Sequence, residues 1–446
     1  MAVRAADPAG DAARPPGMPL ARHGALKSAH PVTTVMKVVG LSLAVLLAST
    51  AAVAGIAVWD VATSLKPSVL LPADTSAPEN SRTPAPSIGA IDGGVNLVLV
   101  GSDSGEGDPA FGERTEHLAD VTLLLHIAHD HSSATVVSFP RDLFVEIPKC
   151  GPAADGAGPG TDGGFVDKLN ASLGYGGLGC TVAVVQRLTG MSIPYAAQIE
   201  FGGVIAMSNA VGGVPVCVSE EIADPNTGTF LAAGPHVLQG VEALQFLRTR
   251  YGLRTGSDLA RIGNQQAFLA SLARTITSDG TLGNPLKLYG LAKAAASNMV
   301  LSKQLQSTDT MVSIARALAD IDLERVAFLQ LPVAEVDGGL DAISDDAAVL
   351  FAALAADVPV TPSGQLGHAS QADPGAPAVP LPTVPDPSAT PFAPPPPGAA
   401  STPSPTGDAG TTPEPAPPAP IVLPATIPGQ TAADRTCAVG RAPDRE

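Results

Sequence analysis

Hydrophobic and polar positions first mark out one long apolar run near the N-terminus. Val38 to Trp59 carries no charged residue, and about twenty helical residues at about 1.5 Å each suffice to cross a ~30 Å hydrocarbon core. A polar, mildly basic arm, residues 1–37, precedes the run, so we expect an uncleaved signal anchor at residues 38–59 and not a cleaved signal peptide. The basic residues before it predict a single-pass cell-membrane protein with a cytoplasmic N-terminus and an extracellular remainder.

Alternating strand and helix patterns fill residues 91–357. Short apolar runs predict strands at Val95–Val100, Asp120–Ile127, Ala134–Phe139, Tyr195–Ile199, Val214–Val218 and Arg325–Leu331. Helical spacing predicts helices at Thr181–Leu188, Phe201–Ala210, Gly240–Leu247, Asp258–Ile276, Leu286–Ala296, Thr308–Leu318 and Asp345–Ala356. This alternation predicts an α/β domain with a mixed central sheet flanked by helices.

Two proline-rich regions flank this domain. Residues 60–90 are rich in Pro, Ser and Ala and predict an extracellular stalk that lifts the domain off the membrane. Residues 358–446 contain runs such as APPPPG and predict an extended, disordered tail with polyproline II character. A wall-threading spacer and an inert linker are equally open for this tail, and only the segment IPGQTAADRTCAVG is a candidate to dock on the domain.

Charge draws attention to one segment. The chain has 25 Lys and Arg against 42 Asp and Glu, a net charge of -17, yet four arginines gather at Arg248, Arg250, Arg254 and Arg261. Planar guanidinium groups bind phosphate or pyrophosphate well, although a solvated helix face would also carry them. Nucleic acid is not the expected anion, because these arginines lie on the extracellular side and the cytoplasmic arm is short and weakly basic.

The four cysteines all follow the apolar run. An even number in an oxidising compartment favours disulfides over thiol chemistry, and the chain has no Cys-x-x-Cys motif for zinc. Sequence order suggests the pairs Cys150–Cys180 and Cys217–Cys437, one of three possible connectivities. The second pair would attach the far end of the tail to the domain.

Two carboxylates stand at predicted strand ends. Asp103 follows the first strand, beside Gly101 and Ser102, and Asp120 begins the second. Ligands of α/β folds often bind at such ends, and two neighbouring carboxylates suit Mg²⁺, which completes its shell with water and phosphate. Taken singly, each aspartate is more typical of a turn or helix cap.

Two further motifs place polar side chains near strand and helix ends. In SFPRD, Pro140 ends a strand and presents Arg141, which Asp142 is able to orient. A surface ion pair of little energetic weight is the alternative. The motif KLN contributes Lys168 and Asn170 before a glycine-rich stretch.

The motifs GSD, SFPRD, KLN, GYGG, AVGGV, GVEALQFLRTRYG and DLARI…QQ stand in this order between about Gly93 and Arg274. Together they resemble the LytR-CpsA-Psr family of cell-envelope phosphotransferases. The resemblance implies an α/β/α domain with a hydrophobic channel for a polyprenyl tail. It also implies an enzyme that transfers a polyprenyl-pyrophosphate-linked glycopolymer to peptidoglycan, through a phosphodiester at the muramic-acid 6-hydroxyl.

The resemblance also implies roles for individual residues. Asp103 and Asp120 match the Mg²⁺ ligands, and the pyrophosphate-binding arginines are matched by Arg141, Arg248, Arg250 and Arg261. Nearby polar positions of the site are matched by Lys168, Asn170 and Gln265. Arg254 matches no motif position. The base for the acceptor hydroxyl is either Asp103 or a metal-bound hydroxide.

The chain also departs from the family pattern. Leu118 replaces an arginine that usually stands two residues before the second aspartate, with Arg114 or His117 as possible substitutes, and Asn264 replaces another frequent arginine. The Ala-, Gly- and Pro-rich composition hints at an actinobacterial origin and an arabinogalactan donor, with teichoic-acid-like or capsular polymers still open. Alternative functions are a lipid pyrophosphate hydrolase and a non-catalytic receptor or regulator that binds lipid-linked precursors.

Overall fold

A computed structural model describes residues 31–71, 93–102, 117–153, 156, 158–375 and 419–441. The chain divides into two compact units, residues 1–57 and 58–446. The helix α1 (Pro31–Thr63) includes an apolar stretch, Thr34–Thr63, with a mean hydropathy of 2.2, which is long and apolar enough to cross a membrane. One N-terminal apolar helix therefore fits a single-pass anchor, and the helix is longer at both ends than the predicted run 38–59.

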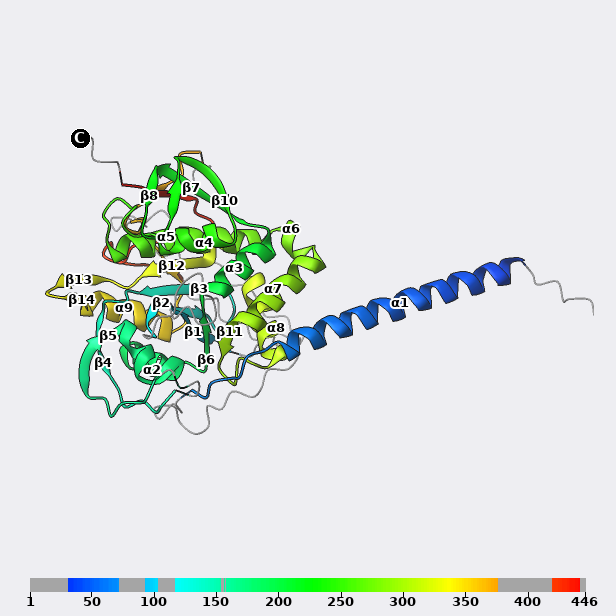
Figure 1. The fold of residues 1–446 in the computed structure, drawn as a ribbon, viewed down its shortest axis with the longest axis horizontal. Helices are drawn as coiled ribbons and strands as arrows, with labels where there is room; N and C mark the ends of the chain where they lie inside the picture. The colour runs from blue at the N-terminus through cyan, green and yellow to red at the C-terminus, as the bar shows by residue number, and fades with distance from the viewer. Residues whose placement is uncertain are drawn as a thin grey trace, which may run out of the picture. The chain divides into compact units, whose positions relative to one another are not determined.

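A mixed seven-stranded sheet forms the centre of the second unit, as predicted (Figure 1). Its strands, in spatial order, are β11 (Met299–Leu301), β6 (Tyr195–Ile199), β1 (Val95–Ser102), β2 (Ala119–Ile127), β3 (Ala134–Phe139), β12 (Val326–Gln330) and β18 (Gly429–Thr431). The pairs β1–β6 and β3–β12 are parallel, and the other neighbours are antiparallel.

Helices cover both faces of this sheet, because alternate residues along each strand point to opposite sides. Val98 and Val100 of β1 belong to a buried cluster with α2 (Ser172–Thr189) and α9 (Ser344–Ala355). Leu97 and Leu99 pack instead against the cluster that includes α5 (Asp258–Thr277) and α8 (Thr308–Ala319). The α/β/α layering implied by the sequence is thereby confirmed.

A second, four-stranded sheet packs on the other side of α5. Its order is β10 (Gly234–Leu238), β7 (Val214–Glu220), β19 (Thr436–Val439) and β16 (Ser370–Ala372). Figure 1 shows α5 and α4 (Val241–Arg248) between this sheet and the central sheet. The buried cluster here joins Val216 of β7, Phe246 of α4, Phe268 of α5 and Val439 of β19. One long helix, α5, therefore has buried contacts on both of its sides.

The remaining elements are short or peripheral. The helices are α3 (Phe201–Val211), α6 (Asp279–Leu282), α7 (Pro285–Asn298), η2 (Leu169–Ala171) and η3 (Leu323–Arg325). The strands are β4 (Phe144–Ile147), β5 (Phe165–Lys168), β8 (Ile222–Asp224), β9 (Thr229–Leu231), β13 (Val333–Val336), β14 (Gly339–Ala342), β15 (Val360–Thr361) and β17 (Ile421–Val422).

The domain extends beyond the predicted boundary at residue 357, which is too early. Residues 358–375 and 419–441 belong to the folded unit: β18 adds to the edge of the central sheet, and β19 pairs in parallel with β7. Cys437 is fully buried. The structure contains both disulfides that sequence order suggested, Cys150–Cys180 and Cys217–Cys437. Residues 358–375 and 419–441 of the tail are therefore folded, and residues 376–418 and 442–446 lie outside the described residues.

The first part of the predicted stalk also packs on the domain. Asp60 lies 2.8 Å from the Lys293 ammonium of α7, and Val69 pairs with Ser302 in an isolated bridge. Lys66 forms an ion pair of 3.4 Å with Glu200, the residue before α3. Residues 60–71 are consequently part of the domain surface, and the rest of the predicted stalk, up to residue 90, lies outside the described residues.

Candidate active site

The Arg141 side chain lies close to three carboxylates, those of Asp120, Asp142 and Asp258. Pro140 ends β3 and turns the chain, and the Arg141 Nη1 then donates a hydrogen bond of 2.7 Å to Asp120 Oδ1 at the start of β2. The Arg141 Nε lies 3.6 Å from a carboxylate oxygen of Asp142 and 3.6 Å from one of Asp258 in the first turn of α5. The neighbouring residue Asp142 and two residues from other segments, Asp120 and Asp258, therefore bring carboxylates to one guanidinium group.

Two further cations complete this ion-pair network. Lys168 at the end of β5 lies 3.0 Å from Asp142, and Arg261 of α5 lies 2.6 Å from Asp258. The Arg261 Nη2 also donates a hydrogen bond of 2.9 Å to the backbone carbonyl of Asp120. The carboxylates of Asp120, Asp142 and Asp258 are thus balanced by Arg141, Lys168 and Arg261, and we call these six residues the charged cluster.

Ionisation within the charged cluster follows from burial and pairing. Burial alone would raise the pKa of Asp142, but Lys168 and Arg141 outweigh it, and the pKa is lowered. Burial would likewise lower the pKa of Arg141, but the hydrogen bond and charge of Asp120 outweigh it and raise the pKa. Arg141 therefore stays positively charged.

Asp258 is the member of the charged cluster that sequence reasoning did not assign to the site. Its side chain is 8% exposed, and burial raises its pKa despite the opposing charges of Arg261 and Arg141. Ser257 caps α5 by accepting a hydrogen bond from the Ala260 amide, which makes Asp258 the first helical residue. An acidic residue there is usual for a helix start, so the sequence signal resembled an ordinary cap.

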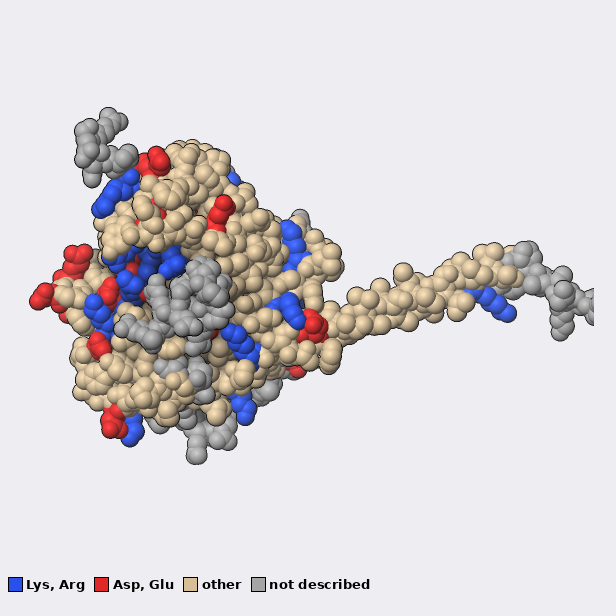
Figure 2. Space-filling model, in the orientation of Figure 1, with Lys and Arg blue, Asp and Glu red and all other residues tan. Residues whose placement is uncertain are grey.

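Three arginine side chains hold a buried donor without a partner. The Nε atoms of Arg141, Arg250 and Arg261 are buried and have no hydrogen-bond partner among the described residues. A buried N–H group without an acceptor is costly, so an anionic ligand would be stabilised here. Both Asp258 carboxylate oxygens are also buried without a hydrogen bond, although one of them lies close to Arg141 and Arg261. Figure 2 shows Lys and Arg side chains gathered beside Asp and Glu in the region where Figure 1 places α5 and β12.

The backbone of the arginine loop, residues 249–256, is held by a buried carboxylate. Asp224 Oδ2 accepts hydrogen bonds from the Thr249 hydroxyl at 2.8 Å, the Arg250 amide at 3.1 Å and the Tyr251 amide at 3.1 Å. Burial would raise the pKa of Asp224, but these hydrogen bonds outweigh it, and the pKa is lowered. Asp224 was missed because, in the sequence ADPNTG, it is indistinguishable from a turn residue.

The two arginines of the α4 segment have different surroundings. The Arg248 guanidinium lies 4.4 Å from the ring centroid of Phe201, at the start of α3, which is a cation–π distance. The Arg250 guanidinium lies 4.5 Å from the Tyr251 ring and donates a hydrogen bond to its hydroxyl. Arg254, by contrast, is exposed and pairs with Glu220 at 3.4 Å. Arg248 and Arg250 thus each lie against an aromatic ring.

A narrow apolar cavity lies beside these charges. It has a volume of about 180 Å³, and residues from β1, β2, α3, α4 and α5 line it, among them Leu99, Val204, Leu247 and Leu269. Its charged lining residues are Asp120, Glu200, Arg248 and Arg261. This volume is below the range of about 300–1,000 Å³ that is usual for drug-sized ligands, so the cavity suits one segment of a hydrocarbon chain.

The predicted amides hold the backbone together. The Gln265 Nε2 donates a hydrogen bond of 3.1 Å to the Leu247 carbonyl, and the Asn264 Nδ2 donates one of 2.6 Å to the Phe246 carbonyl. For Asn170 the donor is the backbone N–H and not the side chain: it donates to the Arg141 carbonyl at 3.0 Å. Asn264 and Gln265 therefore fix the end of α4 against α5, although Gln265 also lines the apolar cavity.

Several predicted positions cannot be compared with the structure. Asp103 and Arg114 lie outside the described residues. Leu118, in place of the family's arginine, is described just before β2 and carries no charge. Among the described residues, the one group of His, Cys, Asp and Glu close enough to share a metal ion is Cys217, Asp373 and Cys437. Both of these sulfurs are in a disulfide, so neither offers a thiolate.

Known proteins resemble this chain over much of its length. Cell wall biosynthesis protein LcpA of Corynebacterium glutamicum is 31% identical over 279 residues, which are 56% of this chain and 52% of that protein. The polyisoprenyl-teichoic acid–peptidoglycan teichoic acid transferase TagT of Bacillus subtilis is 27% identical over 184 residues, 40% of this chain and 51% of TagT. The chain thus spans about half the length of these curated relatives.

A solved structure is also similar to part of this chain. The LytR-Csp2A-Psr enzyme from Actinomyces oris has a TM-score of 0.49 and 20% identity, covering 65% of this chain and 96% of that one. A sequence model of the LytR_cpsA_psr family matches residues 72–354, which include the charged cluster, the arginine loop and the apolar cavity. Because this match covers more than half of the chain, the protein belongs to the LytR_cpsA_psr family.

Proposed function

We propose that this protein transfers a glycopolymer from a polyprenyl-pyrophosphate carrier to peptidoglycan. One observation carries the proposal: the buried Nε donors of Arg141, Arg250 and Arg261 have no hydrogen-bond partner among the described residues, and Arg261 also lines an apolar cavity. A lipid pyrophosphate supplies both an anion for the arginines and a hydrocarbon chain for the cavity. The name of its relative TagT, a polyisoprenyl-teichoic acid–peptidoglycan teichoic acid transferase, supports the same reaction class.

The arginines would act by positioning and charge neutralisation, which dominate catalysis of phosphoryl transfer. An acceptor hydroxyl attacks the phosphorus that bears the glycan, the new P–O bond forms, and the bond to the bridging oxygen breaks. The electron pair leaves with the polyprenyl phosphate. Arg141, Arg250 and Arg261 stabilise the negative charge that grows on this leaving group, while Lys168 keeps Asp142 in place.

Mg²⁺ is the proposed cofactor. Asp120 is a suitable ligand because Mg²⁺ prefers carboxylate oxygens. Its Oδ1 atom accepts a hydrogen bond from Arg141, while its Oδ2 atom has no hydrogen-bond partner among the described residues. Asp103 is the proposed second ligand and a candidate base for the acceptor proton. When bound, the ion would offset part of the pyrophosphate charge.

Membrane orientation belongs to the same proposal. A helix long enough to span the bilayer leads directly into residues 60–71, and Lys66 in this segment pairs with Glu200, which lines the apolar cavity. An ion pair thus links one lining residue of the apolar cavity to the segment that follows the apolar helix. We propose that the N-terminus is cytoplasmic and that the domain meets its lipid donor at the extracellular face of the membrane.

The donor and the new bond are the finer parts of the proposal. We propose a phosphodiester at the muramic-acid 6-hydroxyl, with an arabinogalactan precursor as the first donor to test. Teichoic-acid-like donors are the comparison, since the names of relatives such as TagT refer to them.

A transfer assay tests the function. The full chain in lipid nanodiscs is supplied with Mg²⁺, a radiolabelled lipid-pyrophosphate glycan and peptidoglycan oligomers. We expect labelled sugar on the oligomers, joined through one phosphate by mass spectrometry. Release of free glycan phosphate with no conjugate would replace the transferase with a hydrolase, and tight donor binding with neither product would indicate a receptor.

A further inference from the structure

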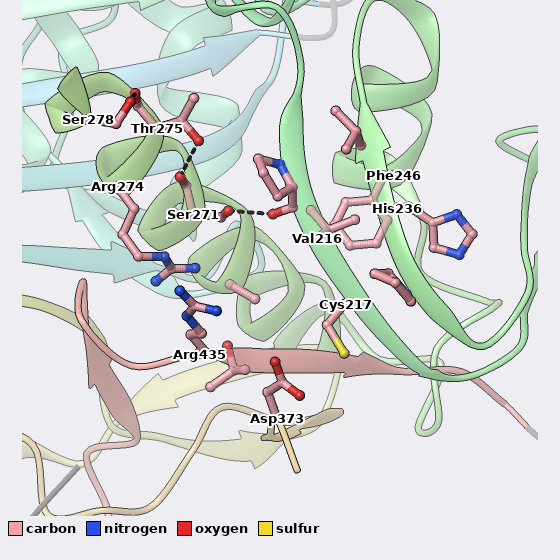
Figure 3. A pocket seen from close by; sticks show the side chains of 15 residues that line it. Val216, Cys217, His236, Phe246, Ser271, Arg274, Thr275, Ser278, Asp373 and Arg435 are labelled. Carbon is pink, nitrogen blue, oxygen red and sulfur yellow. Dashed lines mark hydrogen bonds between the residues drawn. The ribbon is translucent and has the colours of Figure 1, made fainter. Parts of the chain in front are cut away.

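A second cavity lies on the opposite side of α5. It has a volume of about 780 Å³ and opens between α5 and the β7–β10 pair of the small sheet (Figure 3). Residues Ala267, Ser271, Arg274 and Thr275 of α5 line it, whereas Arg261, Gln265, Leu269 and Leu272 line the apolar cavity described above. The two sets alternate along the helix, so α5 separates two different cavities.

Two arginines form one wall of this second cavity. Figure 3 shows the guanidinium groups of Arg274 and Arg435 next to each other, and repulsion from Arg435 adds to the burial that lowers the pKa of Arg274. The Arg274 Nη1 is occupied, since it donates to the carbonyls of Ala432 and Asp434 at 2.6 and 2.8 Å. Arg435 forms no side-chain hydrogen bond or ion pair with any described residue, while the nearby Asp434 carboxylate partly offsets the charge of Arg274.

An acidic group lines another part of the same cavity. Asp373 accepts a hydrogen bond from the Gly375 amide at 2.9 Å, and no described cation forms an ion pair with it. The remaining walls are mixed: Val216, Val237 and Phe246 are apolar, and Ser271 and Thr275 carry hydroxyl groups. The cavity is therefore lined by two arginines, one aspartate and several apolar side chains.

We propose that this second cavity binds a short peptide through its carboxylate and an ammonium group. The carboxylate would accept hydrogen bonds from Arg435 and Arg274, and the ammonium would pair with Asp373. A polyanion such as a phosphate polymer suits the site less well, because Asp373 would repel it. The cavity volume lies within the range of about 300–1,000 Å³ of small-ligand sites.

The inference rests on the proposed function for the identity of the peptide. Peptidoglycan carries short stem peptides with free carboxylates and an amine, so the acceptor itself supplies a ligand of this chemistry. Along α5, Ser271 and Arg261 are ten residues apart, or about 15 Å. An extended tetrapeptide reaches about 14 Å. The carboxylate end of the peptide, at Arg274, lies thirteen residues or about 20 Å from Arg261 along the helix axis, so the attached glycan would have to cover the remaining distance to the charged cluster.

Calorimetry on the full chain in nanodiscs tests the peptide site, without donor and with a chelator present. The probes are a soluble stem tetrapeptide with free amine and carboxylate, its terminal amide, its N-acetylated form and inorganic phosphate. We expect the free tetrapeptide to bind. The terminal amide, and separately Arg435→Gln, should each weaken binding by about tenfold or more, since each removes a charge-assisted hydrogen bond.

A double-mutant comparison identifies the ammonium contact. Asp373→Asn and N-acetylation should each weaken binding several-fold, with little further loss when combined. Arg187→Gln, which removes an exposed pair with Glu146, is the matched control and should change nothing. Equal binding by all variants, or displacement of the peptide by equimolar phosphate, would overturn the proposal. Because no donor is present, failure here would leave the transferase untouched, and a chain that binds peptide but transfers no glycan would sink only the proposed reaction.

Discussion

The two cavities on either side of α5 differ in the ligand chemistry that their lining residues favour. The inner cavity is small and apolar, with Arg248 and Arg261 among its lining and unpartnered Nε donors in the adjoining cluster. The outer cavity is larger and mixed, with an arginine pair and a separate carboxylate. We therefore propose that one helix separates a site for a lipid-borne diphosphate from a site for a zwitterion. The arginines alone do not distinguish the two cavities, since both cavities contain them. The apolar residues of the inner cavity and the acidic residue of the outer cavity distinguish them.

The largest effect should come from the arginine loop. Arg250→Ala removes a guanidinium whose contacts are local, so we expect transfer to fall on the order of a thousandfold, while the melting temperature barely changes. Arg254→Ala, four residues on, removes only an exposed pair with Glu220 and should stay within about twofold of wild type. Steady-state transfer rates and calorimetric melting measure both. Equal rates for the two variants would remove Arg250 from the site.

Asp224→Asn should have the next largest effect, because Asp224 is fully buried and anchors the arginine loop. We expect a loss of about 2 kcal/mol in unfolding free energy and roughly a thirtyfold fall in transfer.

The pH dependence of stability checks the origin of this effect. The folded-state pKa of Asp224 is lowered, so its stabilisation is present above the ordinary aspartate pKa of about 4 and is lost as pH falls below it. Wild type should lose more stability on acidification than Asp224→Asn. Parallel acid-unfolding curves for the two proteins would contradict the anchoring role.

Filling each cavity in turn should separate the two ligands. Val204→Trp fills the inner cavity and should raise the KM for the lipid donor about tenfold, with a smaller change in kcat. Val237→Trp, at a 61% exposed position in the outer cavity, should leave the donor KM unchanged and weaken stem-peptide binding. Donor kinetics and peptide calorimetry are measured on both variants. If Val237→Trp raised the donor KM and Val204→Trp weakened peptide binding instead, the ligands proposed for the two cavities would have to be exchanged.

The smallest expected effect concerns Leu118, which replaces a family arginine before Asp120. Leu118→Arg adds a partly solvated cation near the start of β2, and we expect donor affinity to rise roughly threefold. Leu118→Gln has similar polarity without charge and serves as the control. If the glutamine variant gains as much as the arginine variant, the gain is not electrostatic.

The core elements of the fold followed from local pattern. The strand at Tyr195–Ile199 and the helix beginning at Asp258 have the predicted starts, because apolar runs and capping residues act over a few positions. β18 and β19 were not predicted, since both are short, follow a proline-rich stretch and pair with β12 and β7, which are about 100 and 220 residues earlier in the chain. These strands are buried by partners that are distant in sequence, and a short stretch of sequence does not reveal such partners.

The candidate site was predictable to a similar degree. Arg141 and Arg261 were identified by motif, and the structure brings both to Asp258. Asp258 and Asp224 were not assigned to the site, because the first resembles a helix cap and the second a turn residue. Asp224 bonds to a loop about 25 residues later, and the Arg274–Arg435 pair joins segments about 160 residues apart. Contacts of this range depend on the fold as a whole.

A structure of the full chain with a polyprenyl pyrophosphate tests the central claim most directly. We predict that the diphosphate accepts hydrogen bonds from the Nε atoms of Arg141, Arg250 and Arg261, and that the first isoprene units enter the apolar cavity beside Leu269. A diphosphate held by Arg274 and Arg435 on the other side of α5, with the apolar cavity empty, would contradict the account.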